Sequence, residues 1–142
     1  MSEIPSPPIP KTQIQLTRTW RNVTALSWLL LGLAILALAI SSRTLGKPTW
    51  WLGPESNPQF FLLWTTPFVP PLASIIASLR FSQWAIQVSL VSSLLLALVA
   101  IFDLSKSPGV AVGEFVLAGA GLLVTIAALA GRTSVAVYPA SI

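Results

Sequence analysis

The sequence contains no cysteine and no histidine, and only 8% of its 142 residues are charged. The absence of these two residue types excludes disulfides, thiol nucleophiles, cysteine-ligated iron–sulfur clusters and the usual zinc and haem ligands. We therefore expect no catalytic residue, no cofactor-binding residue and no metal ligand. A soluble domain carries about 25% charged residues, so this chain has too little charge to cover a globule in water. These absences favour a protein of the membrane.

Apolar residues make up 54% of the chain and lie in long uncharged intervals. About 20 apolar residues in a helix cross the hydrocarbon core of a bilayer, and the intervals that reach this length are residues 23–42, 58–79, 82–102 and 108–130. Links of a few residues join the second span to the third and the third to the fourth, which favours antiparallel neighbours. We predict an all-α, polytopic membrane protein whose residues 23–131 form an antiparallel bundle of four transmembrane helices.

The first span has an alternative interpretation as a signal peptide. A basic leader precedes it, and Ala37-Leu38-Ala39 resembles a cleavage site with small residues. The leader is long for that role, and the apolar run extends beyond the usual signal-peptide core. We favour an uncleaved helix.

The basic residues predict the orientation, because cytoplasmic loops carry an excess of lysine and arginine. With the N-terminus inside, the cytoplasmic side holds Lys11, Arg18, Arg21, Arg80 and Arg132, and the outer side holds Arg43, Lys47 and Lys106. We predict a multi-pass protein of the cell (inner) membrane with a Pro-rich cytoplasmic arm over residues 1–22 and a short cytoplasmic tail over residues 132–142. The pI of about 10.4 then reflects topology and attraction to anionic membrane lipids, and not nucleic acid as a partner.

The second span is interrupted by Pro67, Pro70 and Pro71. Each proline lacks an N–H and crowds the carbonyl four residues earlier, so we expect a kink with freed carbonyls. Thr65 and Thr66 are the hydroxyl groups nearest in sequence to satisfy them. Such a break serves as an ion or substrate site in transporters with discontinuous helices, but we favour a structural kink.

Glu114 is the only acidic residue within a predicted span, and Asp103 begins the turn that precedes that span. An ionisable group in the membrane is by default a functional candidate. The alternatives for Glu114 are a side chain that reaches the outer headgroups or one that is hydrogen-bonded among the helices. The sequence does not give the separation of the two carboxyl groups, and acid–base catalysis would need them to converge.

Small residues and indoles predict the remaining contacts. Glycine allows helices to approach closely, and indole rings gather at membrane interfaces. The predicted helix-packing residues are Gly109, Gly113, Gly119, Gly121 and the three prolines of the second span. The predicted interface anchors are Trp20, Trp28, Trp50, Trp51 and Trp84.

Three functions are compatible with these features. The first is a non-catalytic accessory or assembly subunit of a larger membrane complex, with other transmembrane subunits or a second copy as partner. The second is a small oligomeric transporter or channel that uses the proline-broken second helix and Glu114. The third is an enzyme, which would require Asp103 and Glu114 to meet beside a substrate. We favour the first and expect no catalysis.

Overall fold

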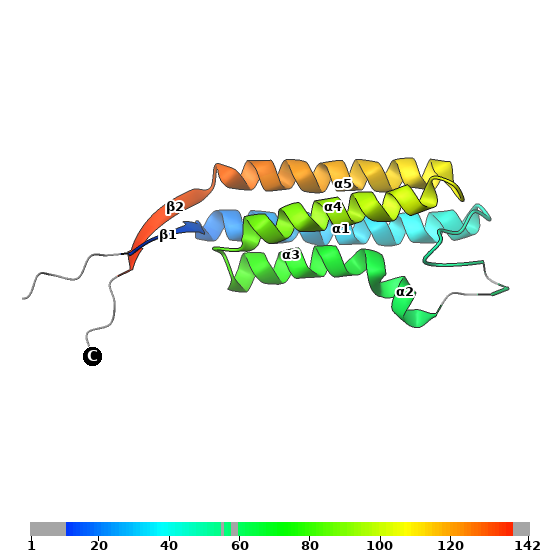
Figure 1. The fold of residues 1–142 in the computed structure, drawn as a ribbon, viewed down its shortest axis with the longest axis horizontal. Coiled ribbons are helices and arrows are strands. Elements are labelled where there is room, and N and C mark those ends of the chain that lie inside the picture. The colour runs from blue at the N-terminus through cyan, green and yellow to red at the C-terminus, as the bar shows by residue number, and fades with distance from the viewer. Residues whose placement is uncertain (1–10, 55, 58–59, 138–142) are drawn as a thin grey trace, which may run out of the picture.

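The computed structural model describes residues 11–54, 56–57 and 60–137, which are mostly helical (Figure 1). The prolines at positions 5, 7, 8 and 10 of the predicted arm lie outside the described residues. In chain order the elements are β1 (Lys11–Leu16), α1 (Arg18–Thr44), α2 (Phe61–Thr65), the 3-10 turn η1 (Thr66–Phe68), α3 (Val69–Arg80), α4 (Ala85–Asp103), α5 (Pro108–Leu129) and β2 (Arg132–Val137).

Four helices are long and apolar enough to cross a membrane, as the spacing of charges predicts. They cover Arg18–Thr44, Phe61–Arg80, Ala85–Asp103 and Pro108–Leu129, and the second combines α2, η1 and α3. The first helix begins at Arg18, inside the segment that the sequence assigns to the arm. Its first turn is held in place because the guanidinium of Arg21 donates hydrogen bonds to the carbonyl oxygens of Ser78 and Leu79 at the end of α3.

The four long helices lie side by side, and each runs opposite to the next in the chain (Figure 1). Helix α1 packs against α3 and α5, and α4 also packs against α3 and α5. The core between them contains Trp28, Leu31, Ile35, Leu96 and Ala118. Trp28 is fully buried and its indole Nε1 donates to Ser89 Oγ at 3.1 Å. The structure therefore places Trp28, one of the predicted interface anchors, in the core between the helices.

A two-stranded antiparallel ribbon extends from one end of the helices (Figure 1). Strands β1 and β2 pair from Lys11 opposite Val137 to Leu16 opposite Arg132. The ribbon was not expected from the sequence, which assigned these residues to an arm and a tail. Leu16 is buried against Ala85 and Ala128. This contact fixes the ribbon to the start of α4 and the end of α5.

The second span changes its helix type at Pro67, where η1 separates α2 from α3. Figure 1 shows α2 directed away from the line of α3. The carbonyl oxygen of Pro70, in the first turn of α3, accepts a hydrogen bond from Ser92 Oγ at 3.0 Å, and Ser92 Oγ itself accepts one from Ser74 Oγ at 2.9 Å. Helix α4 therefore supplies a hydroxyl to the start of α3. The carbonyl of Leu63, four residues before Pro67, accepts the backbone N–H of Thr66.

Candidate functional site

The connection between α1 and α2 folds a tight turn across one end of the helices. The backbone N–H groups of Leu52 and Gly53 both donate to the carbonyl oxygen of Thr49, at 3.2 and 3.0 Å. Gly53 has φ +69°, a left-handed conformation that favours glycine. The turn sends the side chain of Trp51 inward, where it is only 1% exposed and packs against Ala39 and Val99.

Two carboxyl groups meet beneath this turn. Asp103 ends α4, and Glu114 lies about two turns into α5 at 3.6 residues per turn. The chain reverses between them in a short loop in which the N–H of Ser107 donates to the carbonyl oxygen of Asp103 at 2.8 Å. Both side chains are buried, with exposed fractions of 0% for Asp103 and 5% for Glu114. The two carboxyl groups therefore lie close together beneath the turn.

Each carboxyl group accepts one hydrogen bond from the tryptophan pair of the turn. The backbone N–H of Trp50 donates to Asp103 Oδ1 at 2.8 Å, and the indole Nε1 of Trp51 donates to Glu114 Oε1 at 3.2 Å. The other oxygens, Asp103 Oδ2 and Glu114 Oε2, have no hydrogen-bond partner in the described part of the chain. Because two ionised carboxylates are acceptors only, they cannot bond to each other without a proton, a water molecule or a cation between them.

The space beside Glu114 is small. A cavity of about 10 Å³ is lined by Glu114 of α5, Pro67 of η1 and apolar side chains of α1 and α4. This volume corresponds to about one water molecule. The site can therefore hold a proton or a single small species, and it has no room for an organic substrate. Within the described ranges, no cluster of three or more acidic, histidine or cysteine side chains could hold a metal.

The remaining residues of the interrupted span lie elsewhere. Thr65 and Thr66 line a groove of about 380 Å³ on the outside of α3 and α4, together with Trp50 and Phe102. Thr65 Oγ1 donates to the carbonyl oxygen of Leu62 in its own helix, at 2.8 Å. Of the residues predicted for the polar site, the structure brings Asp103 and Glu114 together and leaves the two threonines apart from them.

The glycines of α5 divide between two environments. A Cβ atom at Gly113 would lie 3.1 Å from Leu38 of α1, and one at Gly121 would lie 2.9 Å from Ser93 Oγ of α4. At Gly109 and Gly119 a Cβ atom would meet nothing within 4 Å. Two glycines thus allow packing inside the protein, whereas two leave open space on the outside of the helix.

Sequence reasoning missed the hydrogen-bonding roles of Trp50 and Trp51. The signal for them is the run Thr49–Gly53, in which two indoles and a leucine precede a glycine in the link between the first two spans, whereas the buried acids belong to the last two helices. Of the other predicted anchors, Trp84 is 57% exposed, and Trp20 packs over Gly131. Pro70 and Pro71 are buried.

The fold and the site define a mostly helical protein with four potential membrane spans and a buried carboxyl pair at one end. No protein-family model, curated protein or solved structure matches the chain.

Proposed function

We propose that this chain is a small integral membrane protein, an antiparallel bundle of four transmembrane helices, that serves as a non-catalytic accessory or assembly subunit of a larger membrane complex. The bundle would lie in the cell (inner) membrane with both termini cytoplasmic. Large apolar side chains on the outside of the four long helices support insertion into lipid. Arg18, Arg80 and Arg132 lie at the end of the protein that carries the β-ribbon, which supports a cytoplasmic position for that end.

The observation that carries the assembly role is the outward face of α5. A Cβ atom at Gly109 or Gly119 would meet nothing within 4 Å, so this face of α5 has room for a neighbouring helix. Gly113 and Gly121 face inward and already contact other helices of the chain. Helices associate in membranes through close van der Waals contact at small residues. We infer that a helix of another subunit, or of a second copy, packs on this face.

The buried carboxyl pair supports the non-catalytic part of the proposal. Glu114 and Asp103 each have one oxygen engaged by the turn that covers them, and the adjacent cavity holds about one water molecule. A substrate bond has no route to either group without displacement of Trp51. The pair therefore acts best as a clamp that closes the loop onto the helix ends.

Leucine substitutions on the outward face test the assembly role. In a pull-down with mild detergent from the native membrane, we expect the unchanged chain to recover a stoichiometric partner or a second copy. Gly109→Leu and Gly119→Leu will each reduce that recovery by about tenfold, which corresponds to 1.4 kcal/mol of binding free energy. Recovery will remain unchanged in the controls Val69→Leu on α3 and Val91→Leu on α4, which enlarge exposed side chains on other helices.

Recovery of the unchanged chain alone would contradict the proposal. Equal losses in the glycine and valine variants would show that bulk anywhere on the exposed helix surface, and not a glycine contact on α5, limits assembly. Circular dichroism of each purified variant checks that its helices are intact.

A second candidate function, a small oligomeric transporter or channel, is favoured by one specific observation. Pro67 at the interruption of the second span and Glu114 line the same cavity, so the broken helix and the buried acid are adjacent. Broken helices that meet an ionisable group form the ion sites of many transporters. The site would then carry a proton or a small cation.

Flux measurements test this second function. In proteoliposomes loaded with a pH-sensitive dye, with Na⁺ flux followed in parallel, Glu114→Gln and Pro70→Ala should reduce transport to near the level of empty liposomes. Glu55→Gln, which removes an acidic group outside the four predicted spans, should leave it unchanged. The absence of proton and Na⁺ flux in the unchanged protein would exclude this candidate for both ions.

A further inference from the structure

Buried oxygen atoms without a hydrogen-bond partner gather at the end of the helices where the carboxyl pair lies. In the part of the chain that the structure describes, they are Thr49 Oγ1, Asp103 Oδ2 and Glu114 Oε2. Their side chains are 1%, 0% and 5% exposed, so bulk water does not reach them. A buried polar atom without a partner costs free energy and calls for a bound water or ion.

Thr49 begins the turn that covers the two carboxyl groups. The N–H of the next residue, Trp50, donates to Asp103 Oδ1 at 2.8 Å. The indole of Trp51 donates to Glu114 Oε1 at 3.2 Å. The hydroxyl of Thr49 therefore lies on the buried side of the same turn, one residue from the contact with Asp103. The turn, the end of α4 and the start of α5 each contribute one unpartnered oxygen.

Neither carboxyl group is paired with a basic side chain among the described residues, since their hydrogen-bond donors are the uncharged N–H groups of the turn. Lys47 and Lys106 in the adjacent connections are exposed. The guanidinium of Arg43 stacks over the ring of Trp64, at 5.1 Å from its centroid. Two carboxylates that are removed from water without a counter-charge are strongly unfavourable. The pair therefore requires a positive charge.

The oxygens and the available space favour a small monovalent cation. Carboxylate and hydroxyl oxygens are ligands of hard cations. The cavity of about 10 Å³ beside Glu114 has room for one species the size of a water molecule. Ca²⁺ takes about six to eight oxygen ligands and Mg²⁺ keeps several waters, which this space does not hold. A proton would bridge the carboxyl oxygens and leave the hydroxyl of Thr49 without a partner.

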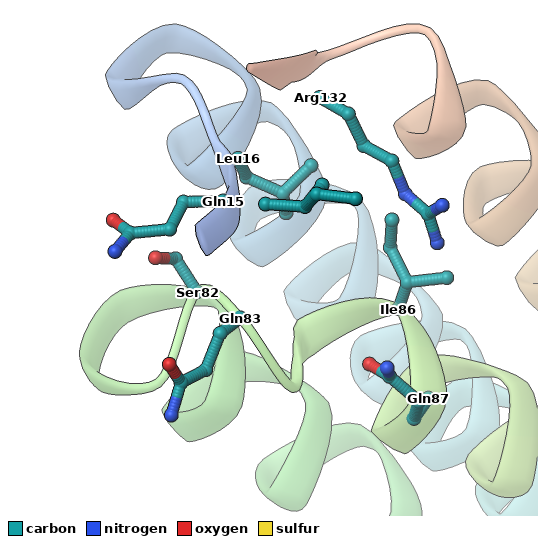
Figure 2. Close-up of a pocket in the computed structure, with 8 residues that line it drawn as sticks. Gln15, Leu16, Ser82, Gln83, Ile86, Gln87 and Arg132 are labelled. Atoms are coloured by element: carbon teal, nitrogen blue, oxygen red, sulfur yellow. The ribbon is translucent and has the colours of Figure 1, made fainter. Parts of the chain in front are cut away.

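The polar pocket at the other end of the helices offers a contrast. It lies between the β-ribbon and the start of α4 and has a volume of about 100 Å³. Figure 2 shows the amides of Gln15 and Gln83 directed away from Arg132, and Gln15 Nε2 already donates to Gln13 Oε1 at 3.3 Å. Its lining residues include none of the unpartnered buried atoms of the described ranges. Unpartnered ligands therefore converge only at the carboxyl end.

We propose that Asp103, Glu114 and Thr49 bind one dehydrated sodium ion beneath the turn. Each side chain supplies one oxygen, and the N–H groups of Trp50 and Trp51 offset the negative charge that a single cation leaves. The ion joins the connection between the first two spans to the last two helices and so strengthens the clamp. The assignment concerns the same site as the transport candidate but does not require transport, and it is independent of the assembly role.

The effect of Na⁺ on the thermal stability of the full-length protein tests the site. The protein is unfolded in a nonionic detergent and followed by circular dichroism, with NaCl replaced by N-methyl-D-glucamine chloride at constant ionic strength. A ligand of the folded state adds about 1.4 kcal/mol for each tenfold rise above its dissociation constant. We therefore expect Tm to rise by about 5 °C for each such tenfold increase in Na⁺, and the larger K⁺ to stabilise less.

Conservative variants identify the ligands. Thr49→Val should weaken the affinity for Na⁺ by about fivefold, the usual contribution of one hydrogen-bonding group. The matched control is Thr24→Val, which removes the other buried hydroxyl without a partner in the described ranges, near the start of α1, and should leave the response unchanged. Glu114→Gln should weaken the affinity by about a hundredfold, because it removes a charged ligand. Each variant is compared with itself in the two salts, so a change in its basal stability does not affect the result.

Several outcomes would overturn the assignment. An equal Tm in Na⁺ and N-methyl-D-glucamine would exclude the ion, and a response to pH without a response to Na⁺ would identify a proton in its place. A response to Ca²⁺ or Mg²⁺ alone would exclude a monovalent cation. Equal affinities for Na⁺ in Thr49→Val and Thr24→Val would exclude the hydroxyl and with it this ligand set. Stabilisation by Na⁺ without flux in proteoliposomes supports the ion site and contradicts only the transport candidate.

Discussion

Replacement of Trp51 by alanine will lower the free energy of unfolding by about 3–5 kcal/mol, the usual cost of truncating a buried tryptophan. The ring is 1% exposed and packs against Ala39, Val99 and, edge to face, Phe68. The alanine variant loses this contact and also removes the indole N–H that Glu114 Oε1 accepts. We expect the effect in equilibrium unfolding in mixed detergent–SDS micelles, followed by the helical circular dichroism signal.

Trp51→Phe separates the packing of the ring from the hydrogen bond. It keeps an aromatic ring but leaves both oxygens of Glu114 without a partner among the described residues, which costs about 1–3 kcal/mol for a buried acceptor. Trp50→Phe is the matched control: it also loses an indole hydrogen bond, the partly exposed one from Nε1 to the carbonyl oxygen of Val99 at 3.3 Å, but it retains the backbone N–H that donates to Asp103. The control should therefore cost less than Trp51→Phe.

The interaction itself is measured by a double-mutant cycle. We expect Trp51→Phe and Glu114→Leu to be less costly together than the sum of their separate effects, with a coupling of about 0.5–3 kcal/mol. Additive effects would mean that the indole and the carboxyl group do not stabilise each other. Equal costs for Trp50→Phe and Trp51→Phe would contradict the inward position of Trp51.

The four long helices could be predicted from the sequence because their signal is local. The expected span 108–130 compares with Pro108–Leu129 in the structure, and 82–102 compares with Ala85–Asp103. Length and apolar composition within one segment suffice for such a prediction. The existence and approximate bounds of the helices follow from residues that are neighbours in the chain.

The ribbon and the carboxyl pair depend on contacts between distant segments. Residues Gln13–Leu16 alternate between polar and apolar side chains, which is a weak strand signal. The strand with which they pair, however, begins at Arg132, at the other end of the chain. The direction of Trp51 likewise depends on the left-handed conformation of Gly53 and on two helices that meet beneath the loop. A preference of tryptophan for interfaces is true on average and gives no information on which indole a fold will bury.

Gly121→Ala will have the second large effect, a loss of about 1–3 kcal/mol in the free energy of unfolding through overpacking. The added Cβ atom would lie 2.9 Å from Ser93 Oγ and 3.0 Å from Cη2 of Trp28. Neither neighbour can easily move. The indole N–H of Trp28 is bonded to Ser89 Oγ, and Ser93 Oγ donates to the carbonyl oxygen of the same Ser89 at 3.0 Å.

Gly119→Ala provides the control two residues away on the same helix. Its Cβ atom meets nothing within 4 Å, so only the helix preference of alanine remains, and stability should rise by about 0.5–1 kcal/mol. The same unfolding measurement in detergent–SDS micelles compares the two variants. A stability equal to or above that of the unchanged protein for Gly121→Ala would contradict the close contact of α5 with α1 and α4.

Trp28→Phe identifies the atoms responsible for the cost at Gly121. The substitution removes the outer ring of the indole, which contains the atoms that a Cβ at residue 121 would meet. Gly121→Ala should therefore cost less in a Trp28→Phe background than in the unchanged protein, although Trp28→Phe alone destabilises the core and loses the bond to Ser89. If the cost at residue 121 is the same in both backgrounds, the clash lies at Ser93 alone. The glycine is then required by the approach of α5 to α4, and the packing of α1 does not depend on it.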